Sequence, residues 1–189
     1  MLKGKFGLVV GVANDQSIAA GCTRAFADAG ATLALTYLNE RALPHVTPEG
    51  GGVGGGMRVA VGPAQAGALE GVFDALRDRW GRLDFLLHSV AFCPKEDLHG
   101  RVTDCSATGF AQAMDISCHS FLRMAKAAEP LMTDGGSLMT VSYYGAEKVV
   151  DHYNIMGPVK AALEACTRHV AAELGPQGIR ANVLSPGPI

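Results

Sequence analysis

Short apolar runs alternate with longer stretches of helical periodicity along most of this chain, and this alternation limits the folds open to it. The apolar runs indicate buried strands over Leu8–Val10, Ala31–Tyr37, Arg58–Val61, Leu83–His88, Ser137–Ser142 and Ile179–Leu184. Helical patterns cover Ser17–Ala29, Ala66–Trp80, Thr108–Met132 and Lys160–Leu174. Strands joined by helices form a parallel sheet with helices on both faces. The pattern therefore predicts an α/β fold, a doubly wound parallel sheet that binds ligands beyond the carboxyl ends of its strands.

Length, charge and cysteine content narrow the class of protein. The chain has 189 residues, 48% of them hydrophobic, which is enough for one domain, and we expect residues 1–189 to form it. A net charge of −2 and short apolar runs predict neither a nucleic-acid nor a membrane partner. The five cysteines show no metal or redox spacing, and the N-terminus shows no signal-peptide cleavage region. We expect a cytoplasmic protein with reduced thiols and no metal site.

Tyr153 and Lys160 are the pair that points most strongly to chemistry. Lys160 opens the amphipathic run that ends at Leu174, and an apolar strand, Ile179–Leu184, follows that run. We expect a phenol and an ammonium about 10 Å apart along one side of a helix, beside a parallel sheet. That arrangement suits a reductase that polarises a carbonyl oxygen next to a nicotinamide.

The segment after the first strand resembles a phosphate-binding turn. Gly11 ends the strand and allows close approach of backbone, and Ser17 stands where a helix N-cap would be. Free N–H groups at a helix N-terminus suit a pyrophosphate. The spacing is not G-x-G-x-x-G, and a plain tight turn between strand and helix is the alternative.

Four motifs appear in an order that resembles a known family. They are Gly11-x5-Ser17-Ile-Ala, His88-Ser-Val-Ala-Phe92, Ser142-Tyr-Tyr-Gly-Ala-Glu147 and Tyr153-x6-Lys160. Together they resemble the NADH-dependent enoyl-(acyl-carrier-protein) reductases, a divergent branch of the short-chain dehydrogenases with Rossmann-type sheets. Most of that superfamily carries Tyr-x3-Lys instead. Tyr144 and Lys148 have this commoner spacing, but Lys148 lies before the segment that leads into the helix.

The resemblance implies a role for each matched residue. Tyr153 would hydrogen-bond the thioester oxygen, Lys160 would hold the nicotinamide ribose, and Tyr143 would line the substrate site. Cys93 matches a position beside the acyl substrate, with a small buried residue as the alternative. Asp115 and Ser117 fit a structural role better than a catalytic one. The remaining positions implied to contact the cofactor are Gly11, Ser17, Ile18, Leu38, Gly62, Ser89, Val90 and Ile189.

The chain also departs from the family pattern. Gly62 and Pro63 stand where the family has an Asp-Val pair for the adenine, and Leu38 replaces a frequent glutamine. We expect NADH as cofactor, with NADPH as the alternative because Arg41 could meet a 2′-phosphate. The segment Gly50–Gly56 contains six glycines and predicts a flexible loop rather than a helix.

The family continues beyond the Gly187-Pro-Ile stretch into a substrate-covering helix, a further helix and a last strand. This sequence stops at Ile189, so we expect a C-terminally truncated fold with an open site. The resemblance implies an enoyl substrate linked to acyl carrier protein or coenzyme A, and a homotetramer. The long helix Thr108–Met132 and the Lys160 helix would form its faces. Two other readings stay open: a carbonyl reductase of the same superfamily, and a nucleotide-binding fragment with impaired catalysis.

Overall fold

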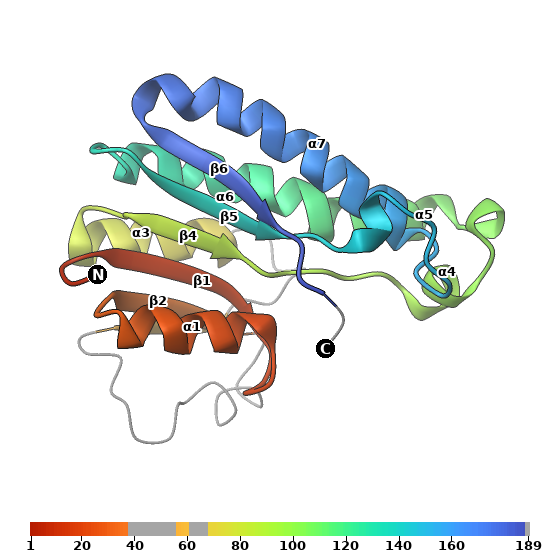
Figure 1. The fold of residues 1–189 in the computed structure, drawn as a ribbon, viewed down its shortest axis with the longest axis horizontal. Helices are drawn as coiled ribbons and strands as arrows, with labels where there is room; N and C mark the ends of the chain where they lie inside the picture. The colour runs from red at the N-terminus through yellow and green to blue at the C-terminus, as the bar shows by residue number, and fades with distance from the viewer. Residues whose placement is uncertain (38–55, 61–67, 188–189) are drawn as a thin grey trace.

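The sheet of this protein is parallel and has the strand order that the alternation predicts (Figure 1). The computed structural model describes residues 1–37, 56–60 and 68–187. Within these ranges six strands pair in the order β3-β2-β1-β4-β5-β6. The strands are β1 (Phe6–Val12), β2 (Thr32–Tyr37), β3 (Met57–Ala60), β4 (Phe85–His88), β5 (Gly136–Val141) and β6 (Ile179–Leu184). The order reverses between β1 and β4, which is where doubly wound sheets bind ligands.

The helices cover the two faces of the sheet unequally in the described residues. The α-helices are α1 (Ile18–Asp28), α3 (Ala68–Trp80), α4 (Lys95–His99), α5 (Ala107–Met114), α6 (Ser120–Ala128) and α7 (Met156–Leu174). Side chains of α3, α6 and α7 share one hydrophobic cluster with β1, β4 and β5, whereas α1 packs on the opposite face. Among the described helices, none is long and apolar enough to span a bilayer.

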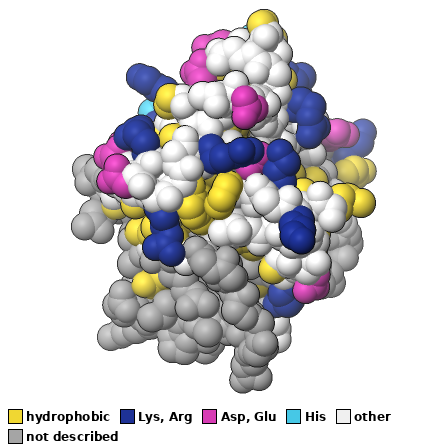
Figure 2. Space-filling model, turned by 90° about the vertical axis from the view of Figure 1, so that its left-hand side faces the viewer, with side chains coloured by type: hydrophobic (Ala, Val, Ile, Leu, Met, Phe, Trp, Pro, Cys, Tyr) yellow, Lys and Arg dark blue, Asp and Glu magenta, His cyan; other side chains and the backbone are white. Residues whose placement is uncertain are grey.

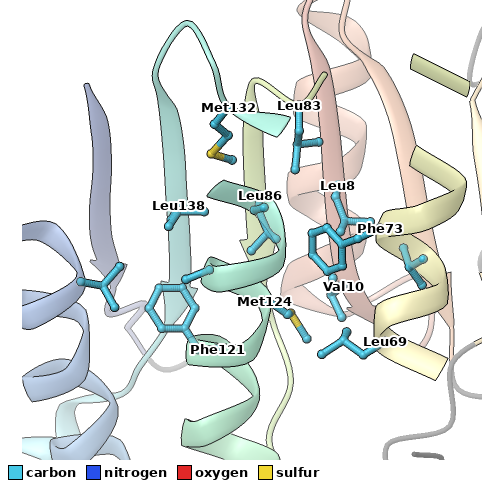
Figure 3. Close-up of a cluster of buried hydrophobic side chains, with 14 of the residues drawn as sticks. Leu8, Val10, Leu69, Phe73, Leu83, Leu86, Phe121, Met124, Met132 and Leu138 are labelled. Atoms are coloured by element: carbon cyan, nitrogen blue, oxygen red, sulfur yellow. The ribbon is translucent and has the colours of Figure 1, made fainter. Parts of the chain in front are cut away.

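The larger core is built where leucine and phenylalanine side chains from α3 and α6 meet the sheet (Figure 3). Leu8 and Leu86 point from neighbouring strands toward Phe73 of α3 and Phe121 of α6. All four side chains are buried from solvent. Burying apolar area contributes about 25 cal/mol per Å², so this layer stabilises the sheet.

The predicted long helix Thr108–Met132 is confirmed as one helical stretch, but its hydrogen bonding is not α-helical throughout. A π-helical turn, Asp115–His119, separates α5 from α6, and a 3-10 turn, Glu129–Leu131, follows α6. A π turn inserts one extra residue into the helical ladder, and periodicity alone does not reveal it.

The short helix α4 was not predicted at all. The expected loop Gly50–Gly56 falls, apart from its last residue, outside the described residues.

Candidate active site

The site begins at the carboxyl ends of β1 and β4, where Gly11 and Ser89 lie against each other. Gly11 has a φ of +97°, and a Cβ added there would come within 2.2 Å of the Ser89 carbonyl oxygen. The Ser89 N–H donates to Val10 O at 2.9 Å, and the Gly11 N–H donates to Thr36 Oγ1 at 3.3 Å. Only glycine fits this close approach, so the first turn leaves backbone rather than side chains at the switch point.

Ser17 is the N-cap of α1, as predicted. Its Oγ accepts the Ala20 N–H at 3.2 Å and donates to Asn14 O at 2.7 Å. Because the hydroxyl is used by the protein itself, an anion at this end would meet backbone N–H groups of the first turn, which begins at Ile18. Gly11, Ser17, Ile18, Ser89 and Val90 therefore flank the ends of β1 and β4 and the start of α1.

Tyr153 and Tyr143 form an edge-to-face pair. Their ring centroids are 4.8 Å apart with an interplanar angle of 64°. Gly145 lies against both rings: an added Cβ would come within 2.5 Å of Tyr153 Cδ1 and 3.1 Å of Tyr143 Cδ1. Burial, and secondarily Tyr143, raises the pKa of the Tyr153 phenol to about 12. Tyr153 therefore remains a hydrogen-bond donor throughout the physiological pH range.

Tyr153 does not lie on the helix with Lys160, so the predicted helical separation was wrong. The helix α7 begins at Met156, and Tyr153 belongs to the turn before it. The Met156 N–H donates to Tyr153 O at 3.0 Å, which joins that turn to α7. Pro158 falls within the first turn of α7, where its missing N–H costs no helical bond.

Lys160 is a buried cation at the carboxyl end of β5. Its side chain donates from Nζ to Val141 O at 2.7 Å, and the residue is only 5% exposed. Burial lowers the pKa of this ammonium to about 8. An ammonium has three N–H donors, and one acceptor is identified for Lys160 among the described residues. The other two donors can meet hydroxyl groups of a ligand.

Ser117 holds the segment between Ser89 and Cys93 in place, in keeping with the predicted structural role. The buried Ser117 Oγ accepts the Phe92 N–H at 2.8 Å and donates to Phe92 O at 3.0 Å. Cys93, the next residue, is partly buried against the larger core. Burial raises the pKa of its thiol, as do Asp97 and Cys105, which favours the neutral thiol over a nucleophilic thiolate.

Three polar residues of the site were missed by sequence reasoning. The buried His88 ring bridges Thr140 Oγ1 and Ser120 Oγ, each at 2.8 Å, and burial lowers its pKa to about 3. Ser142 donates to Glu164 Oε1 at 2.6 Å. His88 and Ser142 stand inside the motifs quoted above, but no spacing rule links Glu164, on a helix, to a serine 22 residues earlier.

The commoner Tyr-x3-Lys spacing, set aside on sequence grounds, forms a local turn in the structure. Tyr144, of the commoner Tyr-x3-Lys spacing, is 55% exposed, and the Lys148 N–H donates to the Tyr144 carbonyl in a local turn. Leu38, Gly62 and Ile189 lie outside the described residues. No three His, Cys, Asp or Glu side chains in the described part of the chain are grouped so that they could hold a metal ion.

Comparison with known proteins gives one consistent answer. The model of the family described as enoyl-(acyl carrier protein) reductase matches residues 11–189. A curated relative, enoyl-(acyl-carrier-protein) reductase (NADH) 1 of Rhizobium meliloti (strain 1021), is 46% identical over 189 residues. That match covers 100% of this chain and 70% of the relative.

Two solved structures resemble the fold closely. The enoyl-(acyl-carrier-protein) reductase of Anaplasma phagocytophilum in complex with NAD has a TM-score of 0.93 and 48% identity, covering 100% of this chain and 72% of that one. The Bacillus cereus enoyl-acyl carrier protein reductase with NADP+ and indole naphthyridinone has a TM-score of 0.92 and 38% identity, covering 100% and 74%.

Proposed function

Since the chain belongs to the enoyl-(acyl-carrier-protein) reductase family, we propose that it reduces the trans-2 double bond of enoyl thioesters with NADH in fatty-acid biosynthesis. The supporting observation is that a neutral phenol, Tyr153, and a buried ammonium, Lys160, both lie against the segment that ends β5: Tyr153 packs on Tyr143, and Lys160 donates to Val141 O. The phenol can donate a hydrogen bond, and the ammonium supplies positive potential, which are the two things a developing enolate needs.

The described residues fit a dinucleotide at the switch point of the sheet. Gly11 lets the ends of β1 and β4 approach closely with no side chain between them, and the N-terminus of α1 follows in the chain. Backbone N–H groups at that end would bind the pyrophosphate, and the Lys160 ammonium would donate to the nicotinamide ribose hydroxyls. Ser17, Ile18, Ser89 and Val90 would line the same path, with Leu38, Gly62 and Ile189 as the proposed adenine and nicotinamide contacts.

NADH, when bound, supplies the hydride that is added to the β-carbon of the enoyl thioester. Tyr153 holds the thioester carbonyl by donating its phenolic O–H, so negative charge that develops on that oxygen is stabilised as the enolate forms. A proton from solvent is then added to the α-carbon, and the product is the saturated thioester. Tyr143 braces the Tyr153 ring, and Cys93 forms part of the wall beside the acyl chain.

We extend the proposal to the organisation of the protein. Residues 1–189 act as one dinucleotide-binding domain, and the enoyl group arrives on acyl carrier protein or on coenzyme A. The protein works in the cytoplasm as a homotetramer, with the segment from α5 to α6 and the helix α7 as the packing faces. NADPH is the alternative cofactor, and comparing the two nicotinamides in one assay decides between them.

The test is NADH oxidation by this chain with a trans-2-enoyl thioester and a 3-oxoacyl thioester offered separately. We expect turnover of the enoyl substrate alone. Turnover of the 3-oxoacyl substrate alone would replace the proposal with a carbonyl reductase. NADH binding without turnover of either substrate would favour a nucleotide-binding fragment.

A further inference from the structure

Asn154, the residue after Tyr153, joins two parts of the site that are far apart in sequence. Its side-chain Nδ2 donates to Leu98 O at 2.7 Å and to Gly100 O at 2.6 Å. An amide nitrogen has two N–H donors, so both are used. The two acceptors lie at the C-terminal end of α4, where the last carbonyl groups of a helix have no partner within the helix.

The backbone around Tyr153 is held in an uncommon conformation on both sides. His152 has a φ of +63° and Asn154 a φ of +39°, and these are the positive-φ non-glycine residues of the described chain. Asparagine tolerates this region better than most residues. Residues kept there persist when surrounding contacts fix them, and they concentrate at functional sites.

The helix α4 follows directly after the proposed substrate wall. It begins at Lys95, two residues beyond Cys93, and Leu98 packs against the larger core. The bonds from Asn154 therefore connect the backbone that carries the Tyr153 phenol to the segment that carries Cys93. In Figure 1 the segment that precedes α7 lies beside α4.

We infer that Asn154 is a positioning residue: its amide ties Tyr153 to the end of α4, which fixes the distance between the phenol and the acyl wall. This inference rests on the proposed function, because it needs Tyr153 as the group that holds the thioester oxygen. A misplacement of about 1 Å can cost on the order of 100-fold in rate. Loss of the two hydrogen bonds therefore lowers kcat more than it lowers the affinity for NADH.

The test compares three substitutions in the whole chain. Asn154→Asp keeps the shape but cannot donate, Asn154→Gly allows the positive φ but has no amide, and Asn154→Ala lacks both features. Asn182→Asp, the same change at an exposed position of β6, is the control for charge. The readouts are kcat with a trans-2-enoyl coenzyme A thioester, Kd for NADH by fluorescence, Tm, and hydrogen exchange.

We expect all three Asn154 variants to lose about 10- to 100-fold in kcat, with Kd for NADH within about twofold of the parent. Exchange should rise together in residues 95–100 and 152–157, and Asn182→Asp should match the parent. A parental kcat in Asn154→Gly would overturn the inference, because the backbone conformation alone would then suffice. If the variants lost NADH affinity and Tm as well as kcat, Asn154 would have a general structural role and the inference would be wrong.

The same experiment separates this inference from the proposed function. An inactive parent chain would contradict the proposed function, and the exchange data would still decide on the tie between Asn154 and α4. If exchange in both segments stayed at the parental level in Asn154→Asp and Asn154→Gly, the tie would be refuted whether or not the parent were active.

Discussion

At the scale of single residues, burial shifts the pKa values of Tyr153 and Lys160 in opposite directions. The phenol, a neutral acid, has its pKa raised to about 12, and the ammonium has its pKa lowered to about 8. Burial disfavours the charged form of each group. At pH 7 the phenol therefore keeps its proton and most of the lysine keeps its charge, which suits a donor and an electrostatic stabiliser.

This difference predicts an alkaline limit on activity that is set by Lys160. As pH rises through about 8 the ammonium loses its proton, so kcat/KM for the enoyl thioester should fall between about pH 7.5 and 9. Lys160→Arg should be slower but should lack this limb, because a guanidinium stays protonated. A rate that stays flat to pH 10 in the parent, or an unchanged limb in Lys160→Arg, would contradict the assignment.

Gly145 gives a steric prediction. The Cβ in Gly145→Ala would come within 2.5 Å of Tyr153 Cδ1, so the ring must shift and kcat should fall about 10- to 100-fold. Gly71→Ala on α3, where an added Cβ meets open space, is the matched control and should keep parental kcat. Steady-state rates of the two variants check this, and equal rates would show that the position of the Tyr153 ring does not matter.

At the scale of elements, β5 and α7 assemble the site through two short polar links. Lys160 donates to Val141 O, and one turn later Glu164 accepts from Ser142, the next residue after Val141. These bonds fix the end of β5 against the helix that carries the cation. The buried His88 performs a similar task between β4, β5 and α6.

Sequence patterns predicted the elements better than the links between them. The apolar runs of β1, β4 and β5, separated by helical patterns, predicted the parallel sheet, and Ser17 predicted the start of α1. The turn that carries Tyr153 was mistaken for helix, because the spacing from Tyr153 to Lys160 carries no sign of positive φ at His152 and Asn154. Side-chain partners such as Glu164 and Ser142 depend on tertiary packing, which no local period encodes.

The link between Ser142 and Glu164 predicts a measurable coupling. A hydrogen bond to a charged group contributes about 1.5–3 kcal/mol, so a double-mutant cycle of Ser142→Ala and Glu164→Ala should give a coupling of about 2 kcal/mol in urea unfolding. Glu164→Gln keeps an acceptor oxygen and should lose less than Glu164→Ala. Strict additivity of the two alanine substitutions would show that the link contributes nothing.

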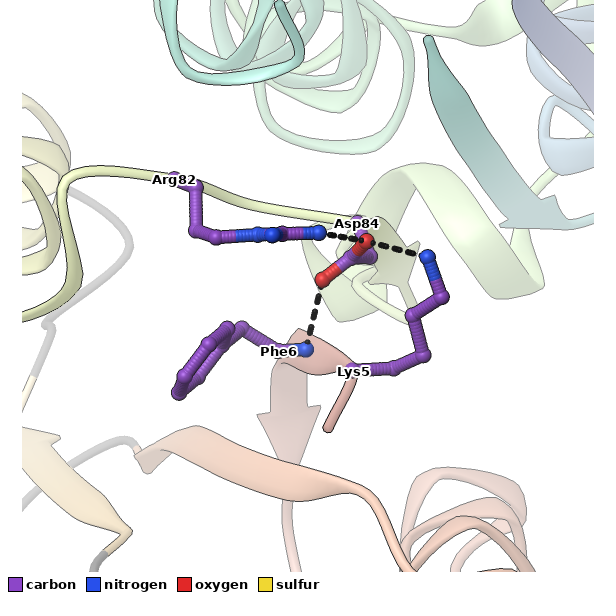
Figure 4. Close-up of polar contacts among 4 residues, drawn as sticks. All are labelled: Lys5, Phe6, Arg82 and Asp84. Carbon is purple, nitrogen blue, oxygen red and sulfur yellow. Dashed lines mark hydrogen bonds and ion pairs between the residues drawn. The ribbon is translucent and has the colours of Figure 1, made fainter. Parts of the chain in front are cut away.

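At the scale of the whole molecule, the two ends of the strands carry different groups of residues. The proposed site lies at the carboxyl ends of the strands, and an ion cluster lies at their amino ends. There Asp84, whose side chain is 12% exposed, accepts from Lys5 Nζ at 2.8 Å, Arg82 at 2.7 Å and the Phe6 N–H at 2.8 Å (Figure 4). Figure 2 shows Lys and Arg side chains around hydrophobic ones on the side where the strands begin.

This cluster predicts acid-sensitive stability. Burial raises the pKa of the Asp84 carboxyl. The hydrogen bonds from Lys5, the Phe6 N–H and Arg82 together lower it by more, so the pKa lies below its ordinary value. Stability from this carboxylate is thus present above about pH 4 and is lost as pH falls through the folded-state pKa.

Asp84→Asn should therefore lower Tm at pH 7, and its deficit relative to the parent should shrink toward pH 3. Asp74→Asn removes an ion pair with Arg77 in which both side chains are more than half exposed, and should change Tm little. Thermal unfolding at the two pH values checks both variants. A deficit of equal size at pH 7 and pH 3 would contradict the role of the Asp84 charge.

The central claim is that this chain delivers hydride to the β-carbon of an enoyl thioester, and the position of a deuterium label tests it directly. The chain is incubated with NADH dideuterated at C4 and a trans-2-enoyl thioester, and the product is read by mass spectrometry and NMR. We predict a saturated thioester with one deuterium at C3 and a solvent proton at C2. Deuterium at any other carbon, or unchanged enoyl thioester with NADH bound, would contradict the claim.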